Sequence, residues 1–169
     1  MKRIQVSAER NYLVTIGDSW VNQIRGLCAG RTRVAIITSK NFTPDLSDLN
    51  DLEAELFYMQ VPDGEEGKSI STLTNLWNWL GAGGFTRSDL VIGIGGGAVT
   101  DLAGFAAATW LRGIDWIAVP TSLAGMVDAS VGGKTGINSD YGKNLIGAFY
   151  SPLAVVIDPS WLTSLSDRD

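Results

Sequence analysis

The sequence predicts an α/β fold in which helices flank a mostly parallel sheet. Short apolar segments at residues 34–38, 90–94 and 155–157 have the length and the β-branched content of buried strands. Segments with apolar residues at helical spacing lie between them. Strands that alternate with helices are typical of a parallel sheet covered on both faces. Because 169 residues are enough to bury one core, we expect a single domain over residues 1–169.

The individual elements follow from apolar spacing and from the residues that begin or end helices. Asp18 and Ser69 are N-cap residues, and Gly30 and Gly81 end the two helices concerned. The Gly-rich sequence between residues 120 and 147 predicts irregular structure. In chain order we expect hairpin strands at 4–7 and 13–16, a helix at 19–29, a strand at 34–38, a weak helix at 44–52, a strand at 57–61, a helix at 70–80, a strand at 90–94, a helix at 99–111, strands at 116–119 and 155–157, and a short helix from 159.

Composition and charge limit the partners. The net charge of −5 argues against a nucleic acid or an anionic membrane surface as the main partner. The first residues lead into strand-like sequence rather than into an apolar leader, and the longest apolar run, 102–111, is too short to cross a bilayer. We therefore expect a cytoplasmic protein without membrane contact.

Histidine is absent, and Cys28 is the only cysteine. The commonest zinc ligands are therefore missing, and we expect no metal site within this chain. A single cysteine cannot form an internal disulfide, which favours a reducing compartment. Cys28 continues a helical apolar stripe with Trp20, Val21 and Ile24, so the pattern predicts that its side chain is packed.

A glycine turn between a strand and a helix is the clearest ligand signal. Four glycines lie within residues 93–97, directly after an apolar strand and before a helical segment. Backbone N–H groups at the positive end of a helix suit an anion such as a nucleotide pyrophosphate. The turn formally matches G-x-G-x-x-A, but Asp115, the acidic residue at the required distance, precedes the next strand instead of ending it. Asp101, in the first helical turn, either hydrogen-bonds a ribose hydroxyl or complements the helix dipole.

A second polar set lies in loop-like sequence further along the chain. Its members are Asp128, Lys134, Lys143 and Asn144. Glycines beside the two lysines let the backbone approach a ligand, and cations near a phosphate-binding turn indicate a phosphorylated one. Spacing alone favours a solvated turn for Glu65 and Lys68, and the helix dipole is enough to explain Arg112 at a helix end.

Several ordered motifs resemble the 3-dehydroquinate synthase family. They are DGEEGKS, GGGAVTDLAGFAAATWLRG, VPTSLAGMVDASVGGKTGIN, GKNLIGAFYSP and VVIDP. The resemblance implies a Rossmann-like NAD-binding α/β domain, followed in the family by a mostly helical domain that holds a divalent metal, usually zinc. It implies that this chain is the amino-terminal half alone, which ends before the family's metal-ligand glutamate and histidines.

The resemblance also implies roles for individual residues. Contacts with NAD are implied at Asp63, Glu65, Lys68, Gly95, Gly96, Gly97, Asp101, Thr121, Ser122, Lys134, Lys143, Trp161 and Ser164. Catalytic or substrate-binding roles are implied for Asp128, Lys134, Lys143, Asn144 and Arg112. Arg112 matches an arginine that reaches the substrate phosphate of the neighbouring subunit, which implies a homodimer.

The activity implied by the resemblance is a step of the shikimate pathway, which leads to the aromatic amino acids. A phosphorylated seven-carbon keto acid, 3-deoxy-D-arabino-heptulosonate 7-phosphate, becomes 3-dehydroquinate and phosphate, with NAD as a recycled oxidant and the metal as a Lewis acid. We expect this chain to supply the NAD-binding half and to be inactive alone. The alternatives are another sugar-phosphate cyclase, a metal-dependent polyol dehydrogenase, or a stand-alone nucleotide-binding or dimerisation module.

Overall fold

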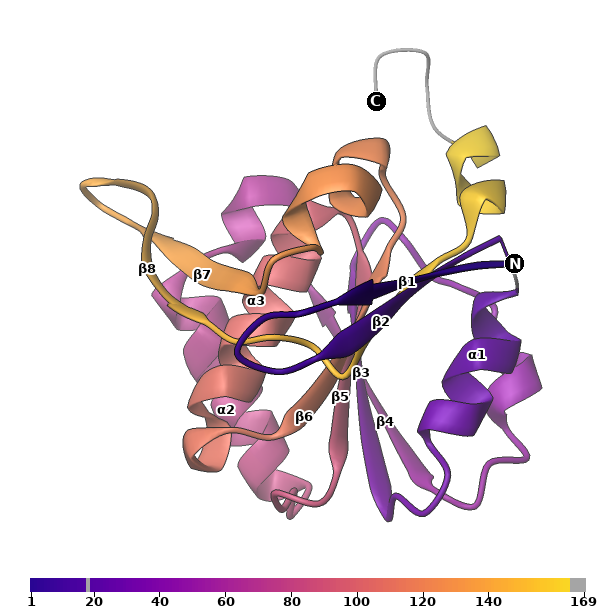
Figure 1. The fold of residues 1–169 in the computed structure, drawn as a ribbon. Helices are drawn as coiled ribbons and strands as arrows, with labels where there is room; N and C mark the ends of the chain where they lie inside the picture. Colours follow the sequence, from indigo (N-terminus) through magenta and orange to yellow (C-terminus); the bar gives the residue numbers. More distant parts are fainter. Residues whose placement is uncertain (18, 165–169) are drawn as a thin grey trace.

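A seven-stranded sheet with the strand order β1-β2-β9-β6-β5-β3-β4 forms the centre of the computed structural model, which describes residues 1–17 and 19–164 (Figure 1). The strands are β1 (Lys2–Val6), β2 (Tyr12–Ile16), β3 (Arg33–Ser39), β4 (Glu55–Val61), β5 (Leu90–Gly95), β6 (Asp115–Pro120) and β9 (Ala154–Ile157). The first two strands form the expected antiparallel hairpin, and the other pairings in the sheet are parallel. The predicted mostly parallel sheet is therefore confirmed.

Helices cover both faces of this sheet. Helix α1 (Trp20–Leu27) lies on one face, and α2 (Ile70–Ala82) and α3 (Gly97–Thr109) lie together on the other (Figure 1). Short 3-10 segments complete the main sequence of elements: η1 (Ser47–Leu49), η2 (Gly64–Gly67), η3 (Trp110–Arg112) and η5 (Pro159–Ser164). In the described part of the chain, no helix is long and apolar enough to cross a membrane.

Alternating side chains along the central strands build two apolar layers. In β3, Val34 and Ile36 pack in the layer beneath α1, whereas Ala35 and Ile37 pack in the layer beneath α2 and α3. Both layers are fully buried, which explains why β3 and β5 read as continuous apolar runs. Cys28 belongs to the α1 layer with 3% of its surface exposed, and burial raises the pKa of its thiol to about 11. Its predicted packing role is confirmed.

The prediction of irregular structure between residues 120 and 147 is wrong. A short π-helix, η4 (Gly125–Ala129), is followed by an antiparallel hairpin of β7 (Lys134–Ser139) and β8 (Gly142–Phe149). Gly136 lies opposite Gly147, and a Cβ on Gly147 would overlap the Thr135 carbonyl oxygen. Glycine is normally depleted in strands, but here it lets the two backbones approach each other.

Other boundaries differ from the predictions in smaller ways. The expected helix at 44–52 is only the three-residue η1, and α3 begins at Gly97 and ends at Thr109. Ser69 caps α2 as predicted, because its hydroxyl accepts a hydrogen bond of 3.2 Å from the Thr72 N–H. Helix α2 continues past Gly81 to a C-cap at Gly83, and the predicted Asp18 cap lies outside the described residues.

The order of the strands determines where a ligand can bind. Strand β3 pairs with β4 on one side and with β5 on the other. The chain therefore runs from β3 outward to β4 and then crosses back to β5, so the strand order changes direction between β3 and β5. In open α/β sheets such a switch point leaves a crevice at the carboxyl ends of the strands. The predicted glycine turn spans the carboxyl end of β5 and the start of α3, and therefore lies at this crevice.

Helix α3 packs closely against both the sheet and the β7–β8 hairpin, which lies beside it in Figure 1. Gly104 occupies this contact, where a Cβ would come within 2.8 Å of the Trp116 ring and also press on the Thr135 methyl group. Gly26, in α1, is different, because a Cβ there would meet no atom of the described residues within 4 Å.

We predict that Gly104→Ala destabilises the fold by about 1–3 kcal/mol through overpacking. The matched control Gly26→Ala should be stabilising by roughly 0.5–1 kcal/mol, because alanine favours a helix over glycine. Urea unfolding followed by tryptophan fluorescence measures both free energies of unfolding. A Gly104→Ala protein as stable as Gly26→Ala would contradict the packing described for α3.

Candidate functional site

The glycine turn joins β5 to α3 with very little space around its backbone. A Cβ on Gly93 would lie 2.7 Å from the Ala103 Cβ, and a Cβ on Gly95 would lie 2.8 Å from Val99. Gly97 has a similar contact of 2.9 Å with Ala129. Gly96 differs, because the nearest described atom to its Cβ position is the Ser122 hydroxyl oxygen at 3.5 Å. Three glycines therefore allow close packing, and Gly96 leaves one side of the turn open.

The open side of the turn lies at the positive end of α3. Gly96 is the N-cap of this thirteen-residue helix, and its backbone is extended with φ −66° and ψ 176°. The Thr121 N–H donates to the Gly95 carbonyl at 2.9 Å, which places the residues after β6 beside the turn. The Ser122 hydroxyl accepts a hydrogen bond of 3.2 Å from the Gly125 N–H. This arrangement suits the binding of a phosphate group by backbone N–H groups.

The most constrained polar group of the site is the Lys68 side chain, which is 2% exposed. Its ammonium donates to Asp101 Oδ2 at 2.6 Å and also to Asn144 Oδ1. Burial raises the pKa of the Asp101 carboxyl, and the hydrogen bond from Lys68 opposes this rise. Because a buried charge requires such partners, the interpretation of Lys68 as part of a solvated turn is wrong.

Asn138, which the sequence analysis did not identify, connects Glu65 to this cluster. Its side-chain N–H donates to Glu65 Oε2 at 2.7 Å, and its side-chain oxygen accepts from the Asn144 N–H at 2.9 Å. The hydrogen bond from Asn138 is the main cause of the lowered pKa of the exposed Glu65 carboxyl. A polar residue next to the buried Ile137 was the available signal, but the hairpin that places it here was not predicted.

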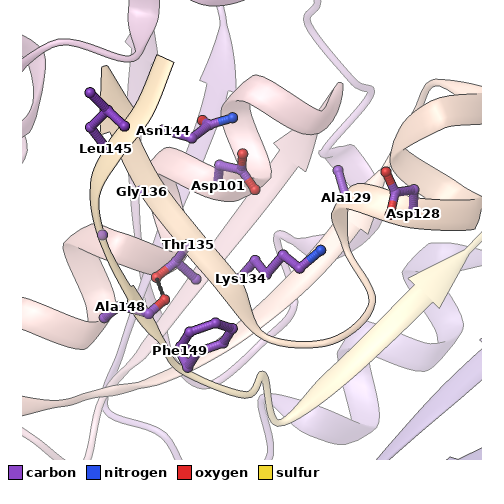
Figure 2. Close-up of a pocket in the computed structure, with 11 residues that line it drawn as sticks. Asp101, Asp128, Ala129, Lys134, Thr135, Gly136, Asn144, Leu145, Ala148 and Phe149 are labelled. Carbon is purple, nitrogen blue, oxygen red and sulfur yellow. Dashed lines mark hydrogen bonds between the residues drawn. The ribbon is translucent and has the colours of Figure 1, made fainter. Parts of the chain in front are cut away.

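A cavity of about 490 Å³ lies between the start of α3, η4 and the β7–β8 hairpin (Figure 2). Asp101, Asp128, Lys134 and Asn144 line it, so four residues predicted from widely spaced motifs meet in one place. Figure 2 shows Lys134 extending from β7 on the side of Asp101 and Asp128. Lys143 is exposed and is not among the described residues that line the cavity. The cavity thus combines carboxylates, an ammonium and an amide.

Three other predicted residues, Asp63, Trp161 and Arg112, do not line this cavity. Asp63 follows β4 and accepts a hydrogen bond of 3.1 Å from Asn41, which follows β3. Trp161 packs against the rings of Trp20 and Phe42, with ring centroids 5.3 and 5.6 Å apart. Arg112 ends η3 at the far end of α3, and the Ser164 side chain lies outside the described structure.

Comparison with known proteins gives matches along the whole chain. Residues 58–169 match the family described as 3-dehydroquinate synthase N-terminal. A 3-dehydroquinate synthase from Streptomyces avermitilis is 47% identical over 163 residues, which cover 94% of this chain and 45% of the relative. The chain therefore spans slightly less than half the length of that relative.

Solved structures of two other synthases have the same fold. A 2-deoxy-scyllo-inosose synthase complexed with carbaglucose-6-phosphate, NAD⁺ and Co²⁺ matches with a TM-score of 0.85 and 28% identity, over 95% of this chain and 46% of that one. The 2-epi-5-epi-valiolone synthase from Streptomyces hygroscopicus, with NAD⁺ and Zn²⁺ bound, matches with a TM-score of 0.84 and 26% identity, over 99% and 48%. The fold, the motifs and the match over residues 58–169 show that this chain belongs to the 3-dehydroquinate synthase family, whose amino-terminal region it matches.

Proposed function

We propose that this chain is the NAD-binding half of a 3-dehydroquinate synthase, a cytoplasmic lyase of aromatic amino acid biosynthesis. The observation that carries the proposal is the position of Asp101. This residue is the fifth of α3, in the second turn of the helix rather than the predicted first, and it lines the cavity that contains Lys134 and Asn144. A cofactor held by the turn and a substrate held in the cavity would therefore be neighbours.

The residues around the glycine turn fit NAD. The open face of Gly96 and the N-terminus of α3 accept the pyrophosphate, and Glu65 and Asp101 offer carboxylates to ribose hydroxyls. Thr121 and Ser122 flank the same turn, and Asp63 lies after β4, which β3 separates from β5. When bound, NAD supplies a reversible hydride acceptor. This chain's residues hold the cofactor beside the cavity and orient it.

The cavity fits an anionic substrate such as 3-deoxy-D-arabino-heptulosonate 7-phosphate. Lys134 supplies a positive charge within the lining, and the exposed Lys143 supplies another beside it. Asn144 and Asp128 offer hydrogen bonds to substrate hydroxyls from two sides of the cavity. Such groups orient the substrate and hold its phosphate without being consumed.

The described residues do not themselves fit a catalytic metal. No group of three or more histidine, cysteine, aspartate or glutamate side chains among them could hold a metal ion. We assign the divalent metal, zinc or another, to the half of the relatives' length that this chain does not match.

The rival functions differ in substrate and in turnover. A different sugar-phosphate cyclase would use the same NAD site with another phosphorylated substrate, and a polyol dehydrogenase would oxidise its substrate without releasing phosphate. A binding or dimerisation module would hold NAD without any turnover. The chain is 47% identical to a 3-dehydroquinate synthase but only 28% and 26% identical to the two solved cyclases, which favours the 3-dehydroquinate synthase function over these rivals.

We predict that Gly96→Val weakens NAD⁺ binding by at least about 100-fold, because the new side chain covers the N–H groups that would contact the pyrophosphate. The fold should persist, since the nearest described atom to the new Cβ is 3.5 Å away. Calorimetric titration measures binding, and circular dichroism checks the fold. Gly26→Val is the matched control, and unchanged NAD⁺ affinity in a folded Gly96→Val protein would contradict the assignment.

Turnover completes this test. Joined to the part of the Streptomyces avermitilis relative that follows its matched region, the chain should release phosphate from 3-deoxy-D-arabino-heptulosonate 7-phosphate when NAD⁺ and zinc are present. The same fusion with Gly96→Val should not. Phosphate release by the 169-residue chain alone would contradict the assignment of the metal to the other half. NAD⁺ binding without turnover in the fusion would favour the module, and turnover of a hexose phosphate alone would favour another cyclase.

A homodimer is part of the same proposal, because the resemblance assigns Arg112 to the substrate phosphate of the neighbouring subunit. In its own chain Arg112 lies beyond the far end of α3, and the eight residues from Asp101 in the cavity lining to Thr109 correspond to about 12 Å. Beside Arg112 lies an apolar groove lined by Trp77, Thr109, Trp110 and Leu111, and Leu111 is 46% exposed. Light scattering should give a molar mass twice that of one chain. In Leu111→Glu the measured mass should fall to that of a single chain. A wild-type protein that stays monomeric up to high concentration would contradict the dimer.

A further inference from the structure

We propose that Asn138 is a positioning residue. It fixes the segment that contains Glu65 and Lys68 relative to the β7–β8 hairpin that contains Asn144. The proposal rests on the functions proposed above for Glu65, Lys68 and Asn144. It assigns to Asn138 no contact with either ligand. Asn138 instead acts through three hydrogen bonds, each to a different member of the site.

The local backbone of β7 makes these three bonds possible. Ile137 pairs with Ile146 but Ser139 pairs with Gly142, so Asn138 of β7 faces the three residues 143–145 of β8 and has no partner in the regular ladder. Such a register shift interrupts the ladder locally and frees backbone groups for other partners. The Asn138 N–H accordingly donates to the Lys68 carbonyl at 2.8 Å, outside the hairpin. This hydrogen bond joins the hairpin to Lys68, the residue that follows η2.

The first side-chain bond orients Glu65. This carboxylate is exposed, and Asn138 Nδ2 donates to its Oε2 atom at 2.7 Å. Exposed glutamates usually sample several rotamers, and fixing one of them reduces the entropy lost when a ligand binds. The hydrogen bond is also the main cause of the lowered Glu65 pKa, with smaller contributions from the charges of Lys68 and Lys143, so the carboxylate stays ionised to lower pH. Asn138 therefore prepares Glu65 as an acceptor for a hydroxyl group.

The second side-chain bond fixes Asn144. Its backbone has φ +58°, a left-handed conformation that residues other than glycine adopt uncommonly. Asn138 Oδ1 accepts from the Asn144 N–H at 2.9 Å and holds this conformation. The Asn144 side chain then reaches the buried Lys68 ammonium. Lys68 is thus held at its backbone by Asn138 directly and at its ammonium through Asn144.

An asparagine is the residue that both side-chain bonds require. Its amide offers a donor and an acceptor on one short side chain, whereas an ionised aspartate has acceptors only. In Asn138→Asp the bond from the Asn144 N–H can persist, but two carboxylates then face each other at Glu65. The proximity of like charges raises the pKa of such a pair, so acidification returns a shared proton and restores a hydrogen bond.

The experiment compares Asn138→Asp and Asn138→Ala with the wild-type chain. NMR titration follows the Glu65 carboxyl, and hydrogen exchange follows the Asn144 amide. We expect a higher Glu65 pKa in both variants and faster Asn144 exchange in Asn138→Ala. NAD⁺ affinity at pH 8 should fall about 10-fold in Asn138→Asp. At pH 6 the difference in NAD⁺ affinity between Asn138→Asp and the wild type should be smaller than at pH 8. General destabilisation of the fold would not produce this pH dependence.

Asn75→Asp is the control, because it adds the same charge at an exposed position of α2 and should change none of these quantities. If Asn138→Ala does not fold, the nearly isosteric Asn138→Asp carries the test. Unchanged NAD⁺ affinity in a folded Asn138→Asp would overturn the proposal, as would a wild-type Glu65 titration. A wild-type chain that binds no NAD⁺ would instead overturn the proposed function, while the Glu65 and Asn144 measurements would still decide the role of Asn138.

Discussion

The buried ammonium group of Lys68 is the constraint on which the rest of the site depends. A charge removed from water requires compensation, and Lys68 obtains it from residues 33 and 76 positions further along the chain. Asp101 comes from α3 and Asn144 from the hairpin, so one cation unites three separate elements. Removal of either partner would leave a buried charge that is poorly paired, which is costly. The cavity forms where these elements meet.

The hydrogen bonds of Lys68 also depend on the position of α3 against the sheet and the hairpin, because α3 carries Asp101. Gly93 lets the helix approach β5 closely, and Gly104 lets the hairpin and the Trp116 ring pack against it. With the helix in place, its N-terminus lies at the open glycine turn, and Asp101 follows as its fifth residue. The small residues of the core therefore determine the geometry of the charged groups. In this way, packing at the sheet sets the spacing between the proposed cofactor and substrate sites.

Patterns within short segments predicted much of this arrangement. The apolar runs of β3 and β5 and the Ser69 cap were sufficient because strand burial and helix capping are local properties. Of the predicted set of Asp128, Lys134, Lys143 and Asn144, all but Lys143 line one cavity. The β7–β8 hairpin was missed because its glycines serve a contact between backbones, which residue preferences do not reveal. The burial of Lys68 and the role of Asn138 depend on that hairpin, so they could not be predicted without it.

Hydrogen exchange of the chain with and without saturating NAD⁺, read by mass spectrometry, tests most directly whether the glycine turn and the Lys68 cluster form one ligand site. We predict slower exchange in residues 95–101, 65–68 and 138–144 when NAD⁺ is present. Helix α1, on the opposite face of the sheet, should be unaffected. Protection of 95–101 without any change in 138–144 would contradict a shared site, and protection confined to other segments would contradict the location of the site itself.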